Sequence, residues 1–248
     1  MITLPCIDND MPFPPACQAL KEPDGLLAFG GDLSATRLLQ AYKLGIFPWY
    51  SAEQPLLWWS PSARMVLRCE ALKISQSLRK LLKRVAREEQ KVDASIRITT
   101  DLCFETVMRA CAAPRGEQAG TWITDEMIQA YTALHRQGYA HSVEVWTEGE
   151  LTGGLYGICI GRMFYGESMF SWRNDTSKIA LARLVTFLTA RQVPWIDCQQ
   201  NTPHLASMGA QPVPRSQFLR HVADAVKQPA FAWPAGKMMA DGTIVPPM

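Results

Sequence analysis

Hydrophobic residues recur with two different periods along the chain, and the change of period separates the predicted helices from the predicted strands. Helical spacing, with capping residues and glycines at the ends, predicts helices over 34–44, 72–91, 101–112, 125–137 and 177–191. Residues 141–146 alternate with period two, and the apolar runs 151–160, 163–170 and 194–199 predict further strands. Three antiparallel strands, one long helix and a last strand describe an α+β fold with a mixed, mainly antiparallel sheet flanked by helices.

The first part of the chain differs in composition from the rest. Residues 1–62 are rich in Pro, Gly and aromatic residues, so we expect a small N-terminal domain over 1–62 and a larger domain over 63–248. The aromatic stretches FPWY at 47–50 and LLWWSP at 56–61 have a loop-like sequence, which suggests an interdomain wall or the lip of a pocket. The tail beyond Lys227 contains four prolines and is expected to be irregular.

Composition limits the class of protein. The chain has 248 residues, of which 48% are hydrophobic and 19% charged, and this mixture supports a packed interior rather than disorder. The seven cysteines form no C-x-x-C pair and the four histidines have no metal-binding spacing, so we expect reduced thiols, no metal and no cofactor. No apolar stretch approaches the ~20 residues of a membrane span, and no leader is visible. We expect a cytoplasmic monomer with no membrane contact.

Charge is concentrated in one predicted helix. The formal net charge is only +2, but residues 73–91 hold seven basic residues and two acidic ones. The basic residues are Lys73, Arg79, Lys80, Lys83, Arg84, Arg87 and Lys91. Helical spacing aligns five of them (Lys73, Lys80, Arg84, Arg87 and Lys91) along one stripe. A solvated helix face is the simpler interpretation, but the shortage of acids before Glu88 favours contact with a polyanion such as RNA.

Three polar residues interrupt apolar strands and are the candidate chemical groups. Glu167, Asp197 and Gln199 each need a hydrogen-bond partner, because burying an unpartnered polar group costs several kcal/mol. Asp197 and Gln199 are two residues apart and should point to the same side of their strand. A purely structural polar network is the alternative.

Two possible nucleophiles are not supported by their surroundings in the sequence. The stretch around Ser168 lacks the final glycine of a G-x-S-x-G elbow, and the neighbours of Cys198 suggest a small buried side chain rather than a nucleophile.

The predicted strand order suggests an acetyltransferase-like (GNAT-type) domain. That family seats the pyrophosphate of coenzyme A on a glycine-rich turn that opens its long helix. Here the corresponding residues 171–178 read SWRNDTSK, without such a turn. The acyl donor is therefore not expected to be a coenzyme A thioester.

Taken together, these features resemble the bacterial leucyl/phenylalanyl-tRNA-protein transferases from about Phe13 to Phe218. The matching stretches are GLLAFGGDLS at 25–34, AYKLGIFPWY at 41–50, WWSP at 58–61, GTWI at 120–123, HSVEVW at 141–146, GGLYG at 153–157, GESMFS at 166–171 and IDCQ at 196–199. Any one of them is weak, but together they are specific. Gln76 and Ala63 depart from the family pattern, and Leu184 stands where some members have an aromatic pocket wall.

The resemblance implies an aminoacyltransferase that moves Leu or Phe, and less well Met, from aminoacyl-tRNA to the N-terminal Arg or Lys of a protein. The product would carry an N-terminal degradation signal. By position, Trp49 would stack on the terminal adenosine, and Glu167 would orient the aminoacyl end. Asp197 and Gln199 would polarise the incoming amine, either as a base relay or as positioning groups. Leu155, Phe164, Met169 and Ile196 would line the amino-acid pocket, and Lys80, Lys83, Arg84 and Arg87 would bind tRNA.

Two alternatives remain open from the sequence. A coenzyme A N-acyltransferase would bind acetyl-coenzyme A, which the missing pyrophosphate turn disfavours. A non-catalytic RNA-binding protein would keep the basic stripe but would not need Glu167, Asp197 and Gln199 together.

Overall fold

The architecture was obtained as a computed structural model, which describes residues 4–51, 53–91, 93–114 and 122–247. The strands are β1 (Leu26–Phe29), β2 (Phe47–Pro48), β3 (Leu57–Trp59), β4 (Ala63–Arg68), β5 (Ile96–Thr100), β6 (Ala140–Thr147), β7 (Glu150–Ile160), β8 (Met163–Ser171), β9 (Trp195–Gln199), β10 (Gln211–Pro214), β11 (Gly236–Met238) and β12 (Ile244–Val245). The helices are α1 (Ala35–Lys43), α2 (Gln76–Glu88), α3 (Phe104–Ala112), α4 (Asp125–Arg136), α5 (Thr176–Ala190), α6 (Pro203–Ser207) and α7 (Arg215–Ala225), with 3-10 turns η1 (Ala16–Gln18) and η2 (Cys69–Ala71).

The strands form two sheets. A small sheet has the order β1-β3-β2, and a long sheet has the order β10-β4-β9-β8-β7-β6-β5-β11-β12. Neighbouring strands of the long sheet are antiparallel except β8 and β9, the one parallel pair within the described ranges. Helix α5 connects these two strands, since a parallel connection requires a crossover. The predicted α+β class, with three meander strands, one long helix and a returning strand, is confirmed.

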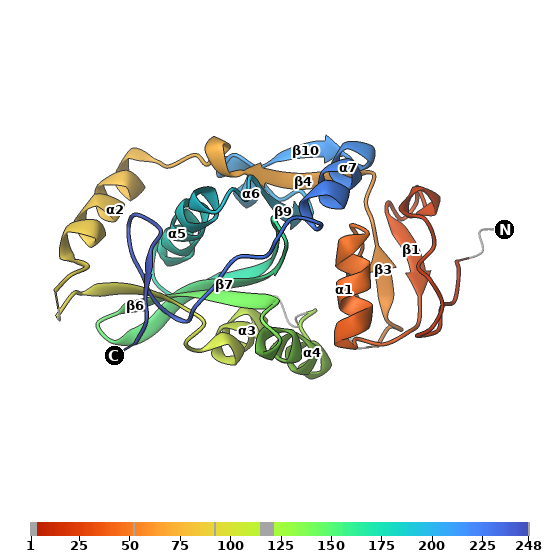
Figure 1. Cartoon of the computed structure of the whole chain (residues 1–248), viewed down its shortest axis with the longest axis horizontal. Helices are drawn as coiled ribbons and strands as arrows, with labels where there is room; N and C mark the ends of the chain where they lie inside the picture. The colour runs from red at the N-terminus through yellow and green to blue at the C-terminus, as the bar shows by residue number, and fades with distance from the viewer. Residues whose placement is uncertain (1–3, 52, 92, 115–121, 248) are drawn as a thin grey trace.

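The helices cover both faces of the long sheet. Figure 1 shows α5 and α2 on one face, α3 and α4 on the other, and α1 with the small sheet at one end of the molecule. Helix α5 is apolar on nearly every side and is correspondingly buried, with Ile179 and Leu188 fully enclosed.

The N-terminal segments share their core with the rest of the chain. Tyr42 and Trp58 belong to the same apolar cluster as Met127 of α4 and Tyr165 of β8. The division into domains 1–62 and 63–248 therefore stays a prediction, although β4 begins at Ala63.

Helix ends follow the capping rules where a local side chain decides them. Ser34 and Thr124 accept hydrogen bonds from the N–H groups of Arg37 and Met127, as the predicted starts of α1 and α4 require. The prediction of a helix from residue 72 was wrong, because Ser75 caps α2 and the N–H of Lys73 donates to Met208 O. Lys73 and Lys91 consequently lie outside the helix. Helix α3 likewise begins after residue 101, at Phe104.

Two predictions of irregular structure were also wrong. The aromatic stretches at 47–50 and 56–61 contain β2 and β3, which pair with each other. The tail contains β11 and β12, and Gly236 of β11 lies opposite Thr100 of β5. The tail is also fixed to the end of α2, because Glu89 Oε2 accepts hydrogen bonds from Ala240 N–H (3.0 Å) and the Arg183 guanidinium (3.2 Å).

Candidate active site

A pocket opens where the two parallel strands separate. Phe164 lies opposite Ile196 and Tyr165 opposite Asp197, and beyond these two pairs β8 and β9 are no longer joined. The pocket at this point has a volume of about 470 Å³. Its walls come mainly from β7, β8, β9 and α5, and residues before α4, after β2 and after β9 complete them.

Most of the pocket wall is apolar. All five residues predicted to contact the substrate lie around it: Trp49, Leu155, Phe164, Met169 and Ile196. Helix α5 contributes Leu181 and Leu184. The Trp49 ring meets the Trp59 ring edge-on at 5.5 Å and remains 38% exposed, so an aromatic face is accessible at the rim. Of the GTWI stretch, Gly120 and Thr121 lie outside the described residues, whereas Trp122 lines the pocket.

A hydrogen-bonded cluster closes the polar end of the pocket. Gln199 Nε2 donates to Glu167 Oε1 at 2.9 Å and so spans the gap between β9 and β8. The Tyr42 hydroxyl donates to the same Glu167 oxygen at 2.8 Å, and the Tyr131 hydroxyl lies 3.3 Å from Oε2. The two tyrosine oxygens are 2.5 Å apart. Four elements, α1, α4, β8 and β9, therefore fix one carboxyl group.

Burial changes the acid strength of this cluster. The pKa of Glu167 is raised to about 7: loss of water is the main cause and the nearby Asp197 carboxylate acts in the same direction, while the hydrogen bonds from Tyr42, Gln199 and Tyr131 act in the opposite direction. Burial raises the pKa of Tyr42 and Tyr131 well above the usual value, so both remain protonated donors. Glu167 can accordingly exist in either protonation state near neutral pH, which suits a group that exchanges protons.

Asp197 binds Arg64, whereas the sequence predicted that it would face the substrate amine together with Gln199. Its carboxylate is fully buried and binds Arg64 through both oxygens, at 2.8 and 2.7 Å. Gln199 adopts a left-handed backbone with φ of 59°, which breaks the strand alternation. The expectation that Asp197 and Gln199 point to one side as a pair is therefore corrected: Gln199 lines the pocket, and Asp197 lies behind it.

Among the described residues of the pocket wall, no thiol is activated. Cys198 lines the wall, but burial raises the pKa of its thiol to about 12, and the neighbouring Asp197 acts in the same direction. A thiol that stays protonated is a poor nucleophile. Cys198 is therefore poorly suited to form a covalent thioester.

The start of α5 is closed by its own side chains. Thr176 Oγ1 donates a hydrogen bond to Thr152 O (2.9 Å), and a Cβ added at Gly153 would lie only 2.2 Å from Thr176 Oγ1. The N–H of Ser177 donates to Ser171 Oγ. A coenzyme A pyrophosphate would need these N–H groups and this space, so the geometry disfavours the coenzyme A alternative.

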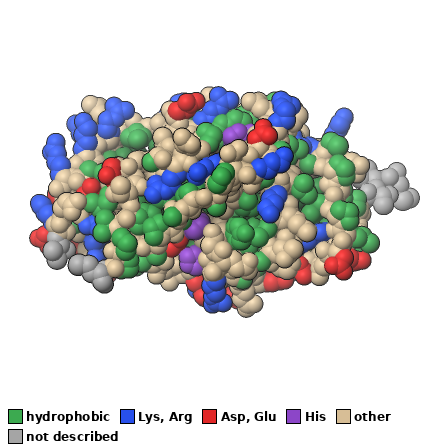
Figure 2. All heavy atoms as spheres, in the orientation of Figure 1, with side chains coloured by type: hydrophobic (Ala, Val, Ile, Leu, Met, Phe, Trp, Pro, Cys, Tyr) green, Lys and Arg blue, Asp and Glu red, His purple; other side chains and the backbone are tan. Residues whose placement is uncertain are grey.

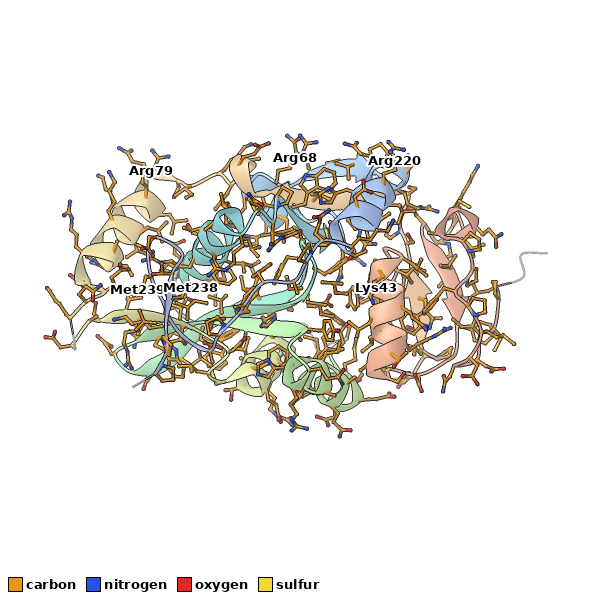
Figure 3. The ribbon with its side chains drawn as sticks, in the orientation of Figure 1. Lys43, Arg68, Arg79, Arg220, Met238 and Met239 are labelled. Atoms are coloured by element: carbon orange, nitrogen blue, oxygen red, sulfur yellow. The ribbon has the colours of Figure 1, made fainter. Side chains whose placement is uncertain are left out.

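The basic residues of α2 form an exposed surface. Lys80, Lys83, Arg84 and Arg87 are all exposed, and none of them forms a salt bridge with another described residue. Figure 2 shows Lys and Arg side chains gathered over α2, and Figure 3 shows Arg79 pointing outward there. Of the predicted stripe, Lys80, Arg84 and Arg87 lie on the helix.

The described residues show neither a metal-binding cluster nor a membrane-spanning helix. Within the described ranges, His, Cys, Asp and Glu side chains nowhere gather in a group of three or more that could hold a metal ion. In the same ranges, every helix is too short or too polar to cross a membrane.

Three residues that bind the candidate groups were not predicted from the sequence: Arg64, Tyr42 and Tyr131. Arg64 interrupts the apolar strand β4 just as Glu167 interrupts β8, so the same argument about buried polar groups applies to it. Tyr42 and Tyr131 gave no such signal, because tyrosine on the apolar face of a helix is ordinary core material.

Known proteins are similar to this chain in structure and in sequence. The structure of a GCN5-related N-acetyltransferase from Kribbella flavida is similar over 70% of this chain and 59% of its own, with 10% identity and a TM-score of 0.34. The family model for the leucyl/phenylalanyl-tRNA protein transferase matches residues 66–223, and the model for its N-terminal domain matches residues 31–62.

Two curated relatives are similar over nearly their whole length. The leucyl/phenylalanyl-tRNA–protein transferase of Bordetella avium is 58% identical over 98% of this chain and 97% of its own. That of Cupriavidus pinatubonensis is 58% identical over 91% of this chain and 90% of its own. The chain therefore belongs to the leucyl/phenylalanyl-tRNA protein transferase family.

Proposed function

We propose that this protein transfers Leu or Phe, and less well Met, from aminoacyl-tRNA to the N-terminal Arg or Lys of acceptor proteins, which gives them a degradation signal. The observation that carries the proposal is the pocket between β8 and β9, apolar along its walls and closed by the Glu167 and Gln199 cluster. An apolar slot suits the side chain of Leu or Phe, and the polar end suits the ester and the amine that react.

The tRNA would bind at two places. The terminal adenosine would stack on Trp49 at the rim, where a base on an aromatic face contributes about 1 to 3 kcal/mol. The phosphates of the tRNA body would contact Lys80, Lys83, Arg84 and Arg87, which are exposed and basic. These contacts would hold the aminoacyl end in the pocket.

The reaction needs few chemical groups. The neutral N-terminal amine attacks the ester carbonyl, the new amide bond forms, and the ribose hydroxyl leaves with a proton. Because the ester is already activated, the enzyme must mainly bring the two substrates together in the correct orientation. Neither ATP nor a metal is required for this chemistry.

Glu167 and Gln199 would orient the reacting groups. Because Gln199 Nε2 donates to Glu167, its carbonyl Oε1 is left as an acceptor for the N–H of the incoming amine. Glu167, with a pKa of about 7, would orient the aminoacyl end. Asp197 would act as a positioning group rather than a base relay, since both of its oxygens already bind Arg64.

A peptide-extension assay tests the proposal. Purified protein is mixed with an Arg-start peptide and Leu-, Phe- or Met-tRNA in parallel, and mass spectrometry detects a peptide longer by one residue. An N-acetylated copy of the peptide is the matched control and should give no product. Absence of product with every hydrophobic aminoacyl-tRNA would refute the proposal. An additional reaction with acetyl-coenzyme A in place of tRNA should leave the peptide unmodified.

The cytoplasmic location and the monomeric state stay predictions. Gel filtration and cell fractionation would test them.

A further inference from the structure

The Arg64 side chain is buried and contacts four residues: Asp197, Gly45, Phe47 and Phe218. It projects from the second residue of β4 and is 1% exposed. Its Nε and one terminal nitrogen bind the two oxygens of Asp197, and the other terminal nitrogen donates to Gly45 O at 3.1 Å. The rings of Phe47 and Phe218 lie 4.4 and 4.7 Å from the guanidinium carbon. The planar guanidinium group of Arg64 therefore cannot rotate without breaking several of these contacts.

The partner of Arg64 controls the backbone of the pocket residue. Asp197 Oδ1 accepts a hydrogen bond from Gln199 N–H at 2.8 Å, in addition to the one from Arg64 Nε. Gln199 has φ of 59°, a conformation that L side chains adopt only when the surroundings impose it. The hydrogen bond to Asp197 is one such constraint, because it fixes the direction of the Gln199 N–H.

The backbone of Gln199 in turn decides where its amide points. From this conformation the side chain reaches across the gap to Glu167 and lines the pocket. We propose that Arg64 is a positioning residue: through Asp197 it holds Gln199 in the left-handed conformation that directs the amide to the reacting groups. This inference rests on the proposed function.

A second buried ion pair provides a matched control. Arg183 of α5 is 5% exposed and binds Glu89 at 3.2 Å, with the side chain of Glu89 15% exposed. This pair fixes the C-terminal tail rather than a pocket residue, because Glu89 also binds the N–H of Ala240. Arg183→Lys therefore removes a buried guanidinium of the same kind without touching Gln199.

The test is a double-mutant cycle on peptide extension. The single variants Arg64→Lys and Gln199→Ala, the double variant, Arg183→Lys and the wild type are compared, with kcat and KM for the Arg-start peptide and the melting temperature of each. Lysine keeps the charge but cannot bind both Asp197 oxygens and Gly45 O together. If Arg64→Lys does not fold, Asp197→Asn takes its place in the same cycle.

The expected result is non-additive. Arg64→Lys should lower kcat about tenfold in the wild type and less than about twofold when Gln199 is already alanine, with KM for the peptide changed less than about twofold. Arg183→Lys should lower the melting temperature without lowering kcat. An equal loss of kcat in both backgrounds, or no loss at all, overturns the role of Arg64. Failure of the wild type to extend the peptide overturns the proposed function itself, so the two failures are distinguishable.

Discussion

Gln199 and Glu167 join β9 to β8 across the gap where the strands separate, through a hydrogen bond of 2.9 Å between Nε2 and Oε1. The main chains of the two strands are paired only at Phe164 with Ile196 and Tyr165 with Asp197. Beyond these two pairs, the hydrogen bond between the Gln199 and Glu167 side chains replaces backbone pairing. A polar bridge of this kind leaves space for substrate while keeping the two walls in register.

The pH dependence of transfer should contain a contribution from Glu167. With a pKa of about 7, this carboxyl group is protonated below pH 7 and charged above it. If the charged form is active, kcat/KM rises with pH through about 7 and again as the acceptor amine loses its proton near pH 8. Glu167→Gln should remove the first rise and keep the second. A pH profile of the variant that retains both rises would contradict this role.

Leu184 should set the size of the amino acid that the pocket accepts. The Leu184 side chain lies on α5, is 1% exposed and forms part of the pocket wall. Leu184→Phe fills part of the cavity, so kcat/KM for Phe-tRNA should fall about tenfold more than for Leu-tRNA. Leu184→Met, which conserves volume, is the control and should leave the ratio of the two values nearly unchanged. An equal effect of Leu184→Phe on both substrates would show that this wall does not select.

The basic face of α2 should account for the salt dependence of tRNA binding. Replacing Lys80, Lys83 and Arg84 by Gln removes three exposed charges, so the slope of log K against log salt should become less negative by about 2 to 3. A triple variant of Lys21, Arg136 and Lys227, which are exposed elsewhere, should keep the wild-type slope. Filter binding across a salt series measures both. An unchanged slope in the α2 variant would exclude this surface.

Glu144 should make the fold less stable as pH rises. It is fully buried beside Thr99 and Ser142, and burial raises its pKa to about 7 from an ordinary 4.5. The folded state therefore favours the protonated form, so its stabilising effect is complete below about pH 4.5 and is lost as the pH passes 7, by about 3 kcal/mol.

Urea unfolding of a Glu144→Gln variant measures this contribution. The free energy of unfolding should fall less between pH 5 and pH 8 in the variant than in the wild type, by up to about 3 kcal/mol. Glu148→Gln, at an exposed position, should follow the wild type. Parallel curves for all three proteins would show that Glu144 does not titrate in this range.

Local signals predicted the regular elements well. Helices α1 and α4 begin where Ser34 and Thr124 can cap them, and the alternation of 141–146 survives as β6. The predicted start at residue 72 failed because Lys73 is tied to Met208, a contact 135 residues away along the chain that no local pattern records. Strand β11 has three residues, and its pairing with Thr99 and Thr100 stabilises it rather than its own sequence.

The site was predictable only in part, because its contacts join residues that are far apart in the sequence. Because Glu167 and Gln199 lie within apolar strands, the sequence predicted that both have hydrogen-bond partners, but it did not identify those partners. Tyr42 reaches Glu167 over a separation of 125 residues, and Arg64 reaches Asp197 over 133. Only the folded chain brings those groups together, and only the left-handed turn at Gln199 separates its side chain from that of Asp197.

The anchoring of the tail at Glu89 has a consequence for proteolysis. Because Glu89 directly follows α2 and accepts a hydrogen bond from Ala240 N–H, cleavage within the tail would remove a contact at the end of the basic helix, and it would also remove the packing of Trp233 against Phe164 of the pocket. A nicked enzyme should then bind both its nucleic acid and a hydrophobic side chain less tightly.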